Sequence, residues 1–224
     1  VVITAGGTRE AIDPVRFLGN RSSGKQGFAL ASAAKKLGAN VHLIAAHVEV
    51  DVPKGLDEIT RVSSAIELRE ATLAATAGAD VLVMAAAVAD FRPANYTDVK
   101  IKKKEEPSED PVIQLVRNPD ILREAVELRH TNPSETAKVI VGFAAETGDA
   151  TTSPLAYGKA KLERKGCDFL AINTVSATQG FGSDRNKLTV LSHNSEVETL
   201  TVEGSKDDVS YALLRHIADY LNNL

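Results

Sequence analysis

The stretch Ala79-Asp80-Val81-Leu82-Val83-Met84-Ala85-Ala86 is apolar at every position except Asp80, and it decides the fold. Strands of a parallel sheet are covered by helices on both faces, so they are continuously apolar, whereas half-exposed strands alternate polar and apolar residues. We therefore predict a buried parallel strand over residues 79–86 and place it at the centre of the sheet.

On both sides of this strand, short apolar runs alternate with longer segments of helical period, which is the pattern of βα units. The predicted strands cover residues 1–5, 41–45, 58–62, 79–86, 112–116, 139–144 and 168–173. Residues 188–191 and 198–202 alternate instead, and predict antiparallel strands around a turn at 193–195. The fold class is therefore α/β, a Rossmann-like mostly parallel sheet with helices on both faces and a C-terminal antiparallel extension.

Helix boundaries follow from capping residues. Ser22 or Ser23 is expected to cap a helix that runs to about Leu37, with Gly38 as its stop. Ser64 is expected to cap a second helix, and the first turn of a third contains Pro119 and Asp120. Further helices are predicted over 154–165 and 207–221, the last burying Val209, Leu213, Ile217 and Leu221. Residues 6–21 are expected to form a long loop, and residues 90–111 an irregular charged stretch.

Length and composition indicate one soluble globular domain over residues 1–224. The chain has 224 residues, against roughly 150 for a typical domain, and is 43% hydrophobic and 25% charged. Its net charge of −4 gives no reason to expect a nucleic-acid partner. No apolar run approaches the roughly 18 residues of a membrane span, so we expect no membrane association and a cytoplasmic location. The start on an apolar β-branched run suggests a piece of a longer chain.

Cysteine and histidine usage gives no protein metal site. A single cysteine, Cys167, excludes an internal disulfide, and the five histidines show no metal-ligand spacing with it or with one another. The site prediction therefore contains no metal-ligating residue.

The ligand site is expected beyond the carboxyl ends of the parallel strands, where the loops at Gly6, Ala86, Phe143 and Asn173 should converge. Gly6-Gly7-Thr8 lets the backbone approach a ligand closely, and the helix start Ser22-Ser23-Gly24-Lys25 offers N–H groups to phosphate oxygens. Together they predict an anion cradle. The alternative is that these glycines serve only turn geometry.

Two familiar motifs match in part. Residues 19–25 have the spacing of a P-loop, but Gln26 stands where a magnesium-binding hydroxyl belongs, and the motif lies far beyond its strand. Tyr157 and Lys161 have the spacing of short-chain dehydrogenases, yet the glycine fingerprint is missing and no acidic residue ends the second strand. We expect Tyr157 to be a packing residue.

Charge in the irregular stretch is concentrated. Lys100-Ile101-Lys102-Lys103-Lys104 is the densest positive run, and Glu105, Glu106, Glu109 and Asp110 follow it directly. This arrangement argues against a nucleic-acid patch and allows a flap that closes over a compact anion, with Arg16, Arg21 and Lys25 joining it. Asp90 can accept hydrogen bonds from a sugar hydroxyl or a base amino group.

The motifs taken together resemble one family. In order they are Gly6-Gly7-Thr8-Arg9-Glu10, Ile12-Asp13-Pro14-Val15-Arg16, Asn20-Arg21-Ser22-Ser23-Gly24-Lys25-Gln26-Gly27, Ala85-Ala86-Ala87-Val88-Ala89-Asp90-Phe91-Arg92, Lys100-Ile101-Lys102-Lys103, Asn118-Pro119-Asp120-Ile121, Gly142-Phe143-Ala144-Ala145-Glu146-Thr147, and Asn173 with Gly180-Phe181 and Asp184. Over most of its length the chain is similar to bacterial phosphopantothenoylcysteine synthetase, the ligase half of the bifunctional coenzyme A biosynthesis flavoprotein.

The resemblance implies a ligase that joins 4′-phosphopantothenate to L-cysteine with CTP as co-substrate. The reaction passes through an acyl-cytidylate and releases pyrophosphate and CMP. The family implies a homodimer, which we expect to form through residues 188–202 because they lack an obvious partner in a parallel sheet. It also implies a fused flavin-dependent decarboxylase domain. Mg²⁺ is expected on the triphosphate, held mainly by phosphate oxygens and water.

Site residues follow from the resemblance and from the anion cradle. Lys100 is expected to offset charge during attack on the α-phosphorus, and Asn20 and Arg16 are expected to serve the second half-reaction. The expected CTP-binding residues are Gly7, Ser23, Gly24, Ala86, Asp90, Lys100, Pro119, Asp120, Ile121, Leu122, Phe143, Lys161 and Lys165. The choice of CTP rests on the resemblance alone, since eukaryotic relatives use ATP. The rival readings are an NAD(P)-dependent short-chain reductase and a non-catalytic nucleotide-binding module.

Overall fold

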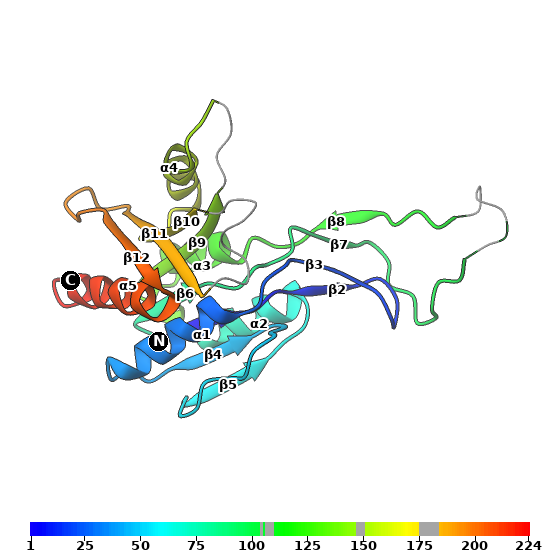
Figure 1. The fold of residues 1–224 in the computed structure, drawn as a ribbon, viewed down its shortest axis with the longest axis horizontal. Coiled ribbons are helices and arrows are strands. Elements are labelled where there is room, and N and C mark those ends of the chain that lie inside the picture. Colours follow the sequence, from blue (N-terminus) through cyan, green and yellow to red (C-terminus); the bar gives the residue numbers. More distant parts are fainter. Residues whose placement is uncertain (104, 106–109, 147–150, 175–183) are drawn as a thin grey trace.

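Eight strands pair into one sheet in the order β12-β11-β10-β9-β6-β1-β4-β5. The computed structural model describes residues 1–103, 105, 110–146, 151–174 and 184–224, drawn in colour in Figure 1. The strands of this sheet are β1 (Val2–Ala5), β4 (His42–Ala45), β5 (Glu58–Arg61), β6 (Val81–Met84), β9 (Val139–Glu146), β10 (Phe169–Thr174), β11 (Arg185–Ser192) and β12 (Leu200–Ser205). All neighbours from β5 to β10 are parallel.

The predicted central strand is confirmed. β6 lies between β1 and β9, with Val83 paired to Ile3 on one side and to Val141 on the other. All four of its residues are buried, as a strand covered on both faces requires.

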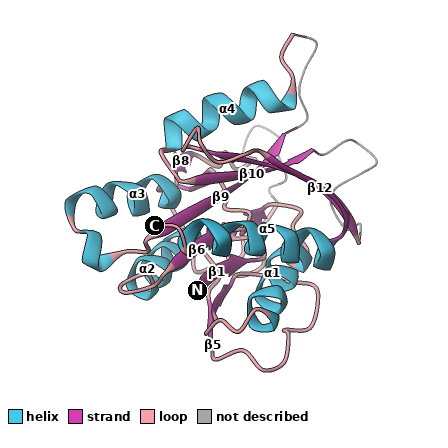
Figure 2. Ribbon diagram, turned by 90° about the vertical axis from the view of Figure 1, so that its left-hand side faces the viewer, coloured by secondary structure: helices cyan, strands magenta, loops and turns pink. Residues whose placement is uncertain are grey.

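Helices cover both faces of the sheet, as predicted. Helices α1 (Lys25–Lys36) and α5 (Lys206–Leu221) pack on one face, and α2 (Ala65–Ala75), α3 (Ile121–Thr131) and α4 (Pro154–Lys165) on the other (Figure 2). Because side chains alternate along a strand, Val83 joins the first core and Leu82 the second. A short 3-10 helix, η2 (Pro133–Glu135), follows α3. In the described residues, no helix is long and apolar enough to cross a bilayer.

The C-terminal extension is antiparallel, but its strands are not left without a partner. β11 pairs with β10, bringing Leu191 opposite Leu170, and β12 pairs with β11. The expectation that residues 188–202 lack a partner is therefore wrong, because they continue the main sheet, with β12 as the edge strand at that end.

Two short ribbons outside the main sheet project from the body and lie side by side (Figure 1). The first is β2 (Arg9–Ala11) with β3 (Phe17–Gly19), where a long loop was predicted. The second is β7 (Phe91–Pro93) with β8 (Leu115–Arg117), so the strand predicted at 112–116 starts later and does not join the main sheet. We call described residues 9–19, 91–103, 105 and 110–117 the arm.

The arm exposes apolar side chains to an unusual degree. Val112 and Val99 are 94% and 69% exposed, and the other large exposed apolar residues of the arm are Val15, Phe17, Phe91, Tyr96, Ile113 and Leu115. Such a concentration of exposed apolar residues on one projecting segment is typical of an interaction surface.

Several helix boundaries agree with prediction. Ser64 caps α2 by accepting a hydrogen bond from the Glu67 N–H, and Gly38 follows α1 with a positive φ of 85°. In α5, Val209, Leu213 and Ile217 are buried as predicted, whereas Leu221 is only partly buried.

Two predicted helix starts are wrong. The N-cap of α1 is Gly24 rather than Ser22 or Ser23, and no side chain caps this helix. Helix α3 begins at Ile121, because Asp120 is its N-cap and accepts a hydrogen bond from the Arg123 N–H at 3.3 Å. The N-termini of α1 and α3 therefore lie at the same edge of the sheet.

Candidate active site

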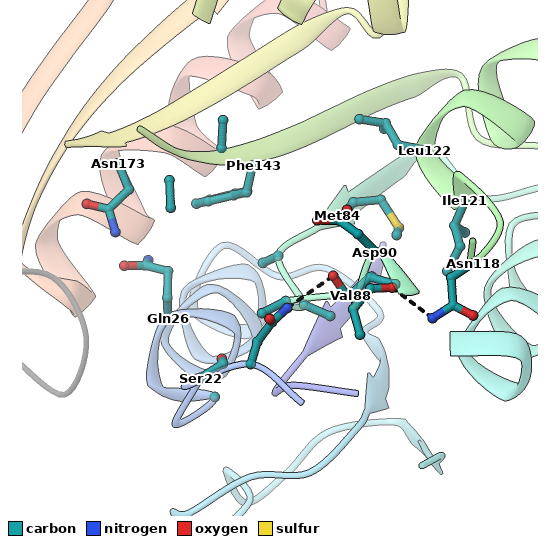
Figure 3. A pocket seen from close by; sticks show the side chains of 18 of the residues that line it. Ser22, Gln26, Met84, Val88, Asp90, Asn118, Ile121, Leu122, Phe143 and Asn173 are labelled. Atoms are coloured by element: carbon teal, nitrogen blue, oxygen red, sulfur yellow. Dashed lines mark hydrogen bonds between the residues drawn. The ribbon is translucent and has the colours of Figure 1, made fainter. Parts of the chain in front are cut away.

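A crevice of about 930 Å³ lies at the carboxyl edge of the parallel strands. The segments that line it are residues 20–26, 84–91, 117–122 and 143–145, together with Lys161, Lys165, Leu170, Asn173, Asn186 and Lys206. The loops at Ala86, Phe143 and Asn173 converge there as predicted, with Phe143 and Asn173 labelled in Figure 3, whereas Gly6 does not line the crevice.

The start of α1 forms one end of the crevice. Gly24 has a φ of 81°, and a Cβ atom there would lie 2.6 Å from Val48 Cγ1, so the position requires glycine. The first turn of α1 holds no acidic residue and receives no side-chain cap. Its positive dipole end therefore faces the crevice without a side-chain cap, which favours an anion there.

The loop after β6 forms the floor, and two buried threonines hold it in place. Thr4 Oγ1 accepts a hydrogen bond from the Ala86 N–H at 3.0 Å, and Thr8 Oγ1 accepts one from the Ala89 N–H at 2.9 Å. Both threonines are fully buried. The loop that carries Asp90 is consequently fixed to β1 and to the segment after it.

Two asparagines bind the same loop from the walls. Asn20 Nδ2 donates to the Val88 carbonyl at 3.1 Å, and Asn118 Nδ2 donates to the Ala89 carbonyl at 2.8 Å (Figure 3). The Asn118 N–H also donates to the Asp90 carbonyl at 2.9 Å. Asn20 therefore lies at the crevice with its amide in contact with the floor.

The far end of the crevice combines apolar contacts with ion pairs. Ile121 and Leu122 line this end, whereas Phe143 lies nearer Asn173 and Gln26 (Figure 3). Lys161 pairs with Glu146 at 2.8 Å, and Lys165 pairs with the α3 N-cap Asp120. Apolar walls beside a few fixed polar groups suit a flat heterocyclic base.

Most of the predicted site residues meet in this crevice: Asn20, Ser23, Gly24, Ala86, Asp90, Pro119, Asp120, Ile121, Leu122, Phe143, Lys161 and Lys165. Gly7 lies beneath it, where a Cβ atom would come within 3.3 Å of the Asn20 carbonyl oxygen and of Ser22 Cβ. Gly7 therefore supports the crevice wall from behind. Thr147, Gly180 and Phe181 of the quoted motifs, and Lys104, Glu106 and Glu109 of the charged run, lie outside the described residues.

Arg16 and Lys100 do not line the crevice, because both belong to the arm. The Arg16 guanidinium donates to the Ile101 carbonyl at 3.1 Å and pairs with Asp13 at 3.1 Å. Lys100, the neighbour of Ile101, is exposed. Two of the three predicted catalytic residues thus lie on the arm, outside the crevice of their own chain.

The two partial motifs have structural explanations. Lys161 lines the crevice whereas Tyr157 does not, so the pair does not meet a common ligand there. Tyr157 is 39% exposed, and its expected packing role stays a prediction. Gln26 donates to Ser210 Oγ and accepts from Asn186 Nδ2, both at 2.8 Å, and so joins α1 to β11 and α5.

Asn186 and Lys206 also line the crevice, although no sequence pattern pointed to them. Both come from the antiparallel extension, which no parallel-strand rule connects to the ligand edge. Among the residues the structure describes, no three His, Cys, Asp or Glu side chains gather as a metal site.

Comparison with known proteins gives one consistent family. Residues 1–221 match the sequence profile of the DNA/pantothenate metabolism flavoprotein C-terminal domain. The coenzyme A biosynthesis bifunctional protein CoaBC of Mycobacterium bovis is 47% identical over 221 residues, covering 99% of this chain and 52% of that protein. The Bacillus subtilis protein of the same name is 44% identical over 219 residues, covering 97% and 50%. The chain thus spans about half the length of the curated relatives it matches.

Solved structures share the fold. The crystal structure of the C-terminal domain of a coenzyme A biosynthesis bifunctional protein CoaBC matches with a TM-score of 0.78 and 31% identity, covering 100% of this chain and 95% of that chain. A Cab2 mutant in complex with phosphopantothenate-cysteine matches with a TM-score of 0.71 and 16% identity, covering 99% and 86%, which is a likeness of fold alone.

Proposed function

Because the chain belongs to the family of DNA/pantothenate metabolism flavoprotein C-terminal domains, we propose that it is a phosphopantothenate–cysteine ligase of coenzyme A biosynthesis. It joins 4′-phosphopantothenate to L-cysteine and uses CTP. The observation that carries this proposal is the crevice itself, which places an uncapped helix start and an apolar end with ion pairs along one continuous cavity. Such a cavity suits a nucleotide whose phosphates lie at α1 and whose base lies beside Ile121 and Leu122.

The chemistry starts from a carboxylate, which is a poor electrophile until one oxygen becomes a leaving group. An oxygen of the 4′-phosphopantothenate carboxylate attacks the α-phosphorus of CTP, and the bond between the α-phosphorus and pyrophosphate breaks. The cysteine amine then attacks the carbonyl carbon of the acyl-cytidylate, and CMP leaves. Both steps develop negative charge that fixed donors and cations must offset.

The proposed roles divide between the crevice and the arm. Asp90 accepts hydrogen bonds from the sugar or base, while residues 119–122, Phe143, Lys161 and Lys165 surround the base. Ser23 and Gly24 hold phosphate oxygens. Asn20 donates toward the acyl carbonyl, Arg16 assists it, and Lys100 offsets charge at the α-phosphate.

Mg²⁺ fits this site as an ion bound to the nucleotide phosphates. Among the described crevice residues the carboxylates are Asp90 and Asp120, and Asp120 is already engaged with Lys165 and the start of α3. Mg²⁺ keeps several waters and binds phosphate oxygens readily, so we propose that it neutralises phosphate charge while the protein contributes few direct ligands.

We also propose that the active form is a homodimer, fused in the full-length protein to a flavin-dependent decarboxylase domain and working in the cytoplasm. The exposed apolar arm supports dimerisation better than the β12 edge does. Since Arg16 and Lys100 lie on the arm, pairing of two arms offers a way to bring them to the partner's crevice.

Pyrophosphate release tests the proposal. CTP and 4′-phosphopantothenate should release pyrophosphate in a single turnover without cysteine, and continuously with it. Protection against thermal unfolding by NADPH but not by CTP would favour a reductase, and protection by CTP without turnover would favour a nucleotide-binding module.

A further inference from the structure

Two lysines from distant parts of the chain meet at the phosphate end of the crevice. Lys25 is the first residue of α1 and Lys206 is the first residue of α5, and both line the crevice. Gln26 bonds to Ser210, one turn beyond Lys206, and this contact joins the two helix starts. Figure 3 shows Gln26 across the crevice from Ile121 and Leu122.

Lys206 occupies a position that is unfavourable for a cation. The residue is only 9% exposed. It also stands at the positive end of the α5 dipole, where cations destabilise a helix. The capping of α5 does not need it, because Ser205 and Asp208 already form a complete capping box. The fold therefore keeps a buried lysine at a helix end where the α5 dipole disfavours a cation.

Most of the surroundings of Lys206 also disfavour its charged form. Burial lowers the pKa of Lys206, the neighbouring Lys25 lowers it further, and Asp184 opposes them. Asp184 is shared, since its carboxylate pairs with Lys25 at 2.7 Å while its carbonyl accepts the Lys206 N–H at 2.9 Å. A lysine that lowers the pKa of a second, buried lysine is typical of a site that binds an anion.

The acidic groups nearby lie on the side away from the crevice. A second hollow of about 360 Å³ is lined by both lysines and by Asp51, Asp184 and Asp207. None of these three aspartates lines the crevice. Because both lysines line both hollows, they lie on the wall between the crevice and this acidic hollow.

We propose that Lys206, together with Lys25, binds the β- and γ-phosphates of the nucleoside triphosphate, the part that leaves as pyrophosphate. This inference rests on the proposed function. When the carboxylate oxygen bonds to the α-phosphorus, the bond from that phosphorus to the bridging oxygen breaks, and its electron pair stays on pyrophosphate. Lys206 binds this growing charge and makes the site prefer a triphosphate over a monophosphate.

The test compares Lys206→Gln with a matched control, Lys187→Gln. Lys187 lies on the neighbouring strand β11, is more than half exposed, and pairs with Glu203 at 3.9 Å outside the crevice. Isothermal titration of each full chain with CTP, CMP and pyrophosphate gives the affinities. Lys206→Gln should weaken CTP and pyrophosphate by about tenfold or more and leave CMP unchanged. Lys187→Gln should change none of them, and Lys206→Arg should recover part of the loss.

The apo proteins supply a second measurement. Removing a buried cation from beside Lys25 should leave the melting temperature of Lys206→Gln equal to or above that of the wild type. If Lys206→Gln melts at a lower temperature and loses equal affinity for CTP and CMP, Lys206 has a structural role and the inference is overturned. The inference is also overturned if Lys206→Gln binds pyrophosphate as tightly as the wild type. If the wild type binds pyrophosphate through Lys206 but not CTP, the proposed function fails while the anion site stands.

Discussion

The Asp13 carboxylate accepts a hydrogen bond from the Ile101 N–H at 3.1 Å, across 88 residues of sequence. The Asp13 side chain is fully buried and also accepts bonds from the N–H groups of Val15 and Arg16, both at 2.8 Å. Burial by itself raises the pKa of Asp13, but these three backbone bonds and the Arg16 charge outweigh it, so the pKa is lowered. One carboxylate therefore joins the two ribbons of the arm and sets the position of Lys100.

Asp13→Asn should loosen the arm while leaving the crevice intact. The amide keeps one acceptor oxygen but loses the charge that pairs with Arg16, so the segment around Lys100 should become more accessible. We expect faster trypsin cleavage after Lys100 and Lys102 and a ligase rate at least about tenfold lower, with CTP affinity unchanged. Asp98→Asn, an exposed position on the same arm, is the control and should behave as the wild type.

The same contact should make the arm sensitive to acid. Because the folded-state pKa of Asp13 lies below its ordinary value of 3.8, its stabilising effect is complete above that value and is lost as the pH falls through the folded-state pKa. Cleavage of the arm by pepsin should therefore accelerate below about pH 3.8 in the wild type. In Asp13→Asn this acceleration should be absent, and an identical pH profile would contradict the assignment.

Lys100 and Asn20 should separate the two half-reactions. Lys100→Gln removes the cation proposed for α-phosphate attack, so pyrophosphate release should fall by about 10²–10³-fold. Asn20→Asp places a negative charge at the acyl carbonyl and should slow the cysteine step by a similar factor, so that acyl-cytidylate accumulates. Quenched single turnovers separated by chromatography show which species forms. Accumulation in Lys100→Gln instead would reverse the assigned roles.

Mixed dimers should reveal whether Lys100 acts in its own crevice or in the partner's. Lys100→Gln and Asn20→Asp subunits are refolded together in equal amounts, so that hybrid dimers with one subunit of each kind form. One crevice of such a hybrid combines wild-type Lys100 with wild-type Asn20 only if Lys100 acts across the dimer. We then expect about a quarter of wild-type turnover. Sedimentation must first show a dimer, and a hybrid without recovered activity would assign Lys100 to its own crevice.

Gly24→Ala should weaken both the fold and the phosphate site. The added methyl group meets Val48 in a left-handed backbone conformation, so we expect a loss of more than about 1–2 kcal/mol in the free energy of unfolding and weaker CTP binding. Gly38 has a similar φ of 85° but open space around it. Gly38→Ala should therefore cost only the backbone strain and leave CTP affinity unchanged, as thermal unfolding with and without CTP can show.

The body of the fold was readable from the sequence because its signals are local. Continuous burial makes a central parallel strand apolar throughout, as in Val81–Met84. Helices are predicted by the period of their apolar residues and by caps such as Ser64. The carboxyl edge of such a sheet is where ligands bind, so Ala86, Asp90 and Phe143 could be assigned to one crevice without coordinates.

What the sequence could not determine are the contacts between segments far apart in the chain. The Asp13–Ile101 bond joins residues about ninety positions apart, and the ribbon β7–β8 joins residues about twenty-five positions apart. Short exposed strands such as these also carry little periodic signal. Likewise, Lys206 lies at the crevice because the antiparallel strands β11 and β12 place the N-terminus of α5 beside the N-terminus of α1. The sequence by itself determined which faces are buried, because burial requires apolar residues. Only the tertiary structure decided which charges meet, because that depends on packing over the whole sheet.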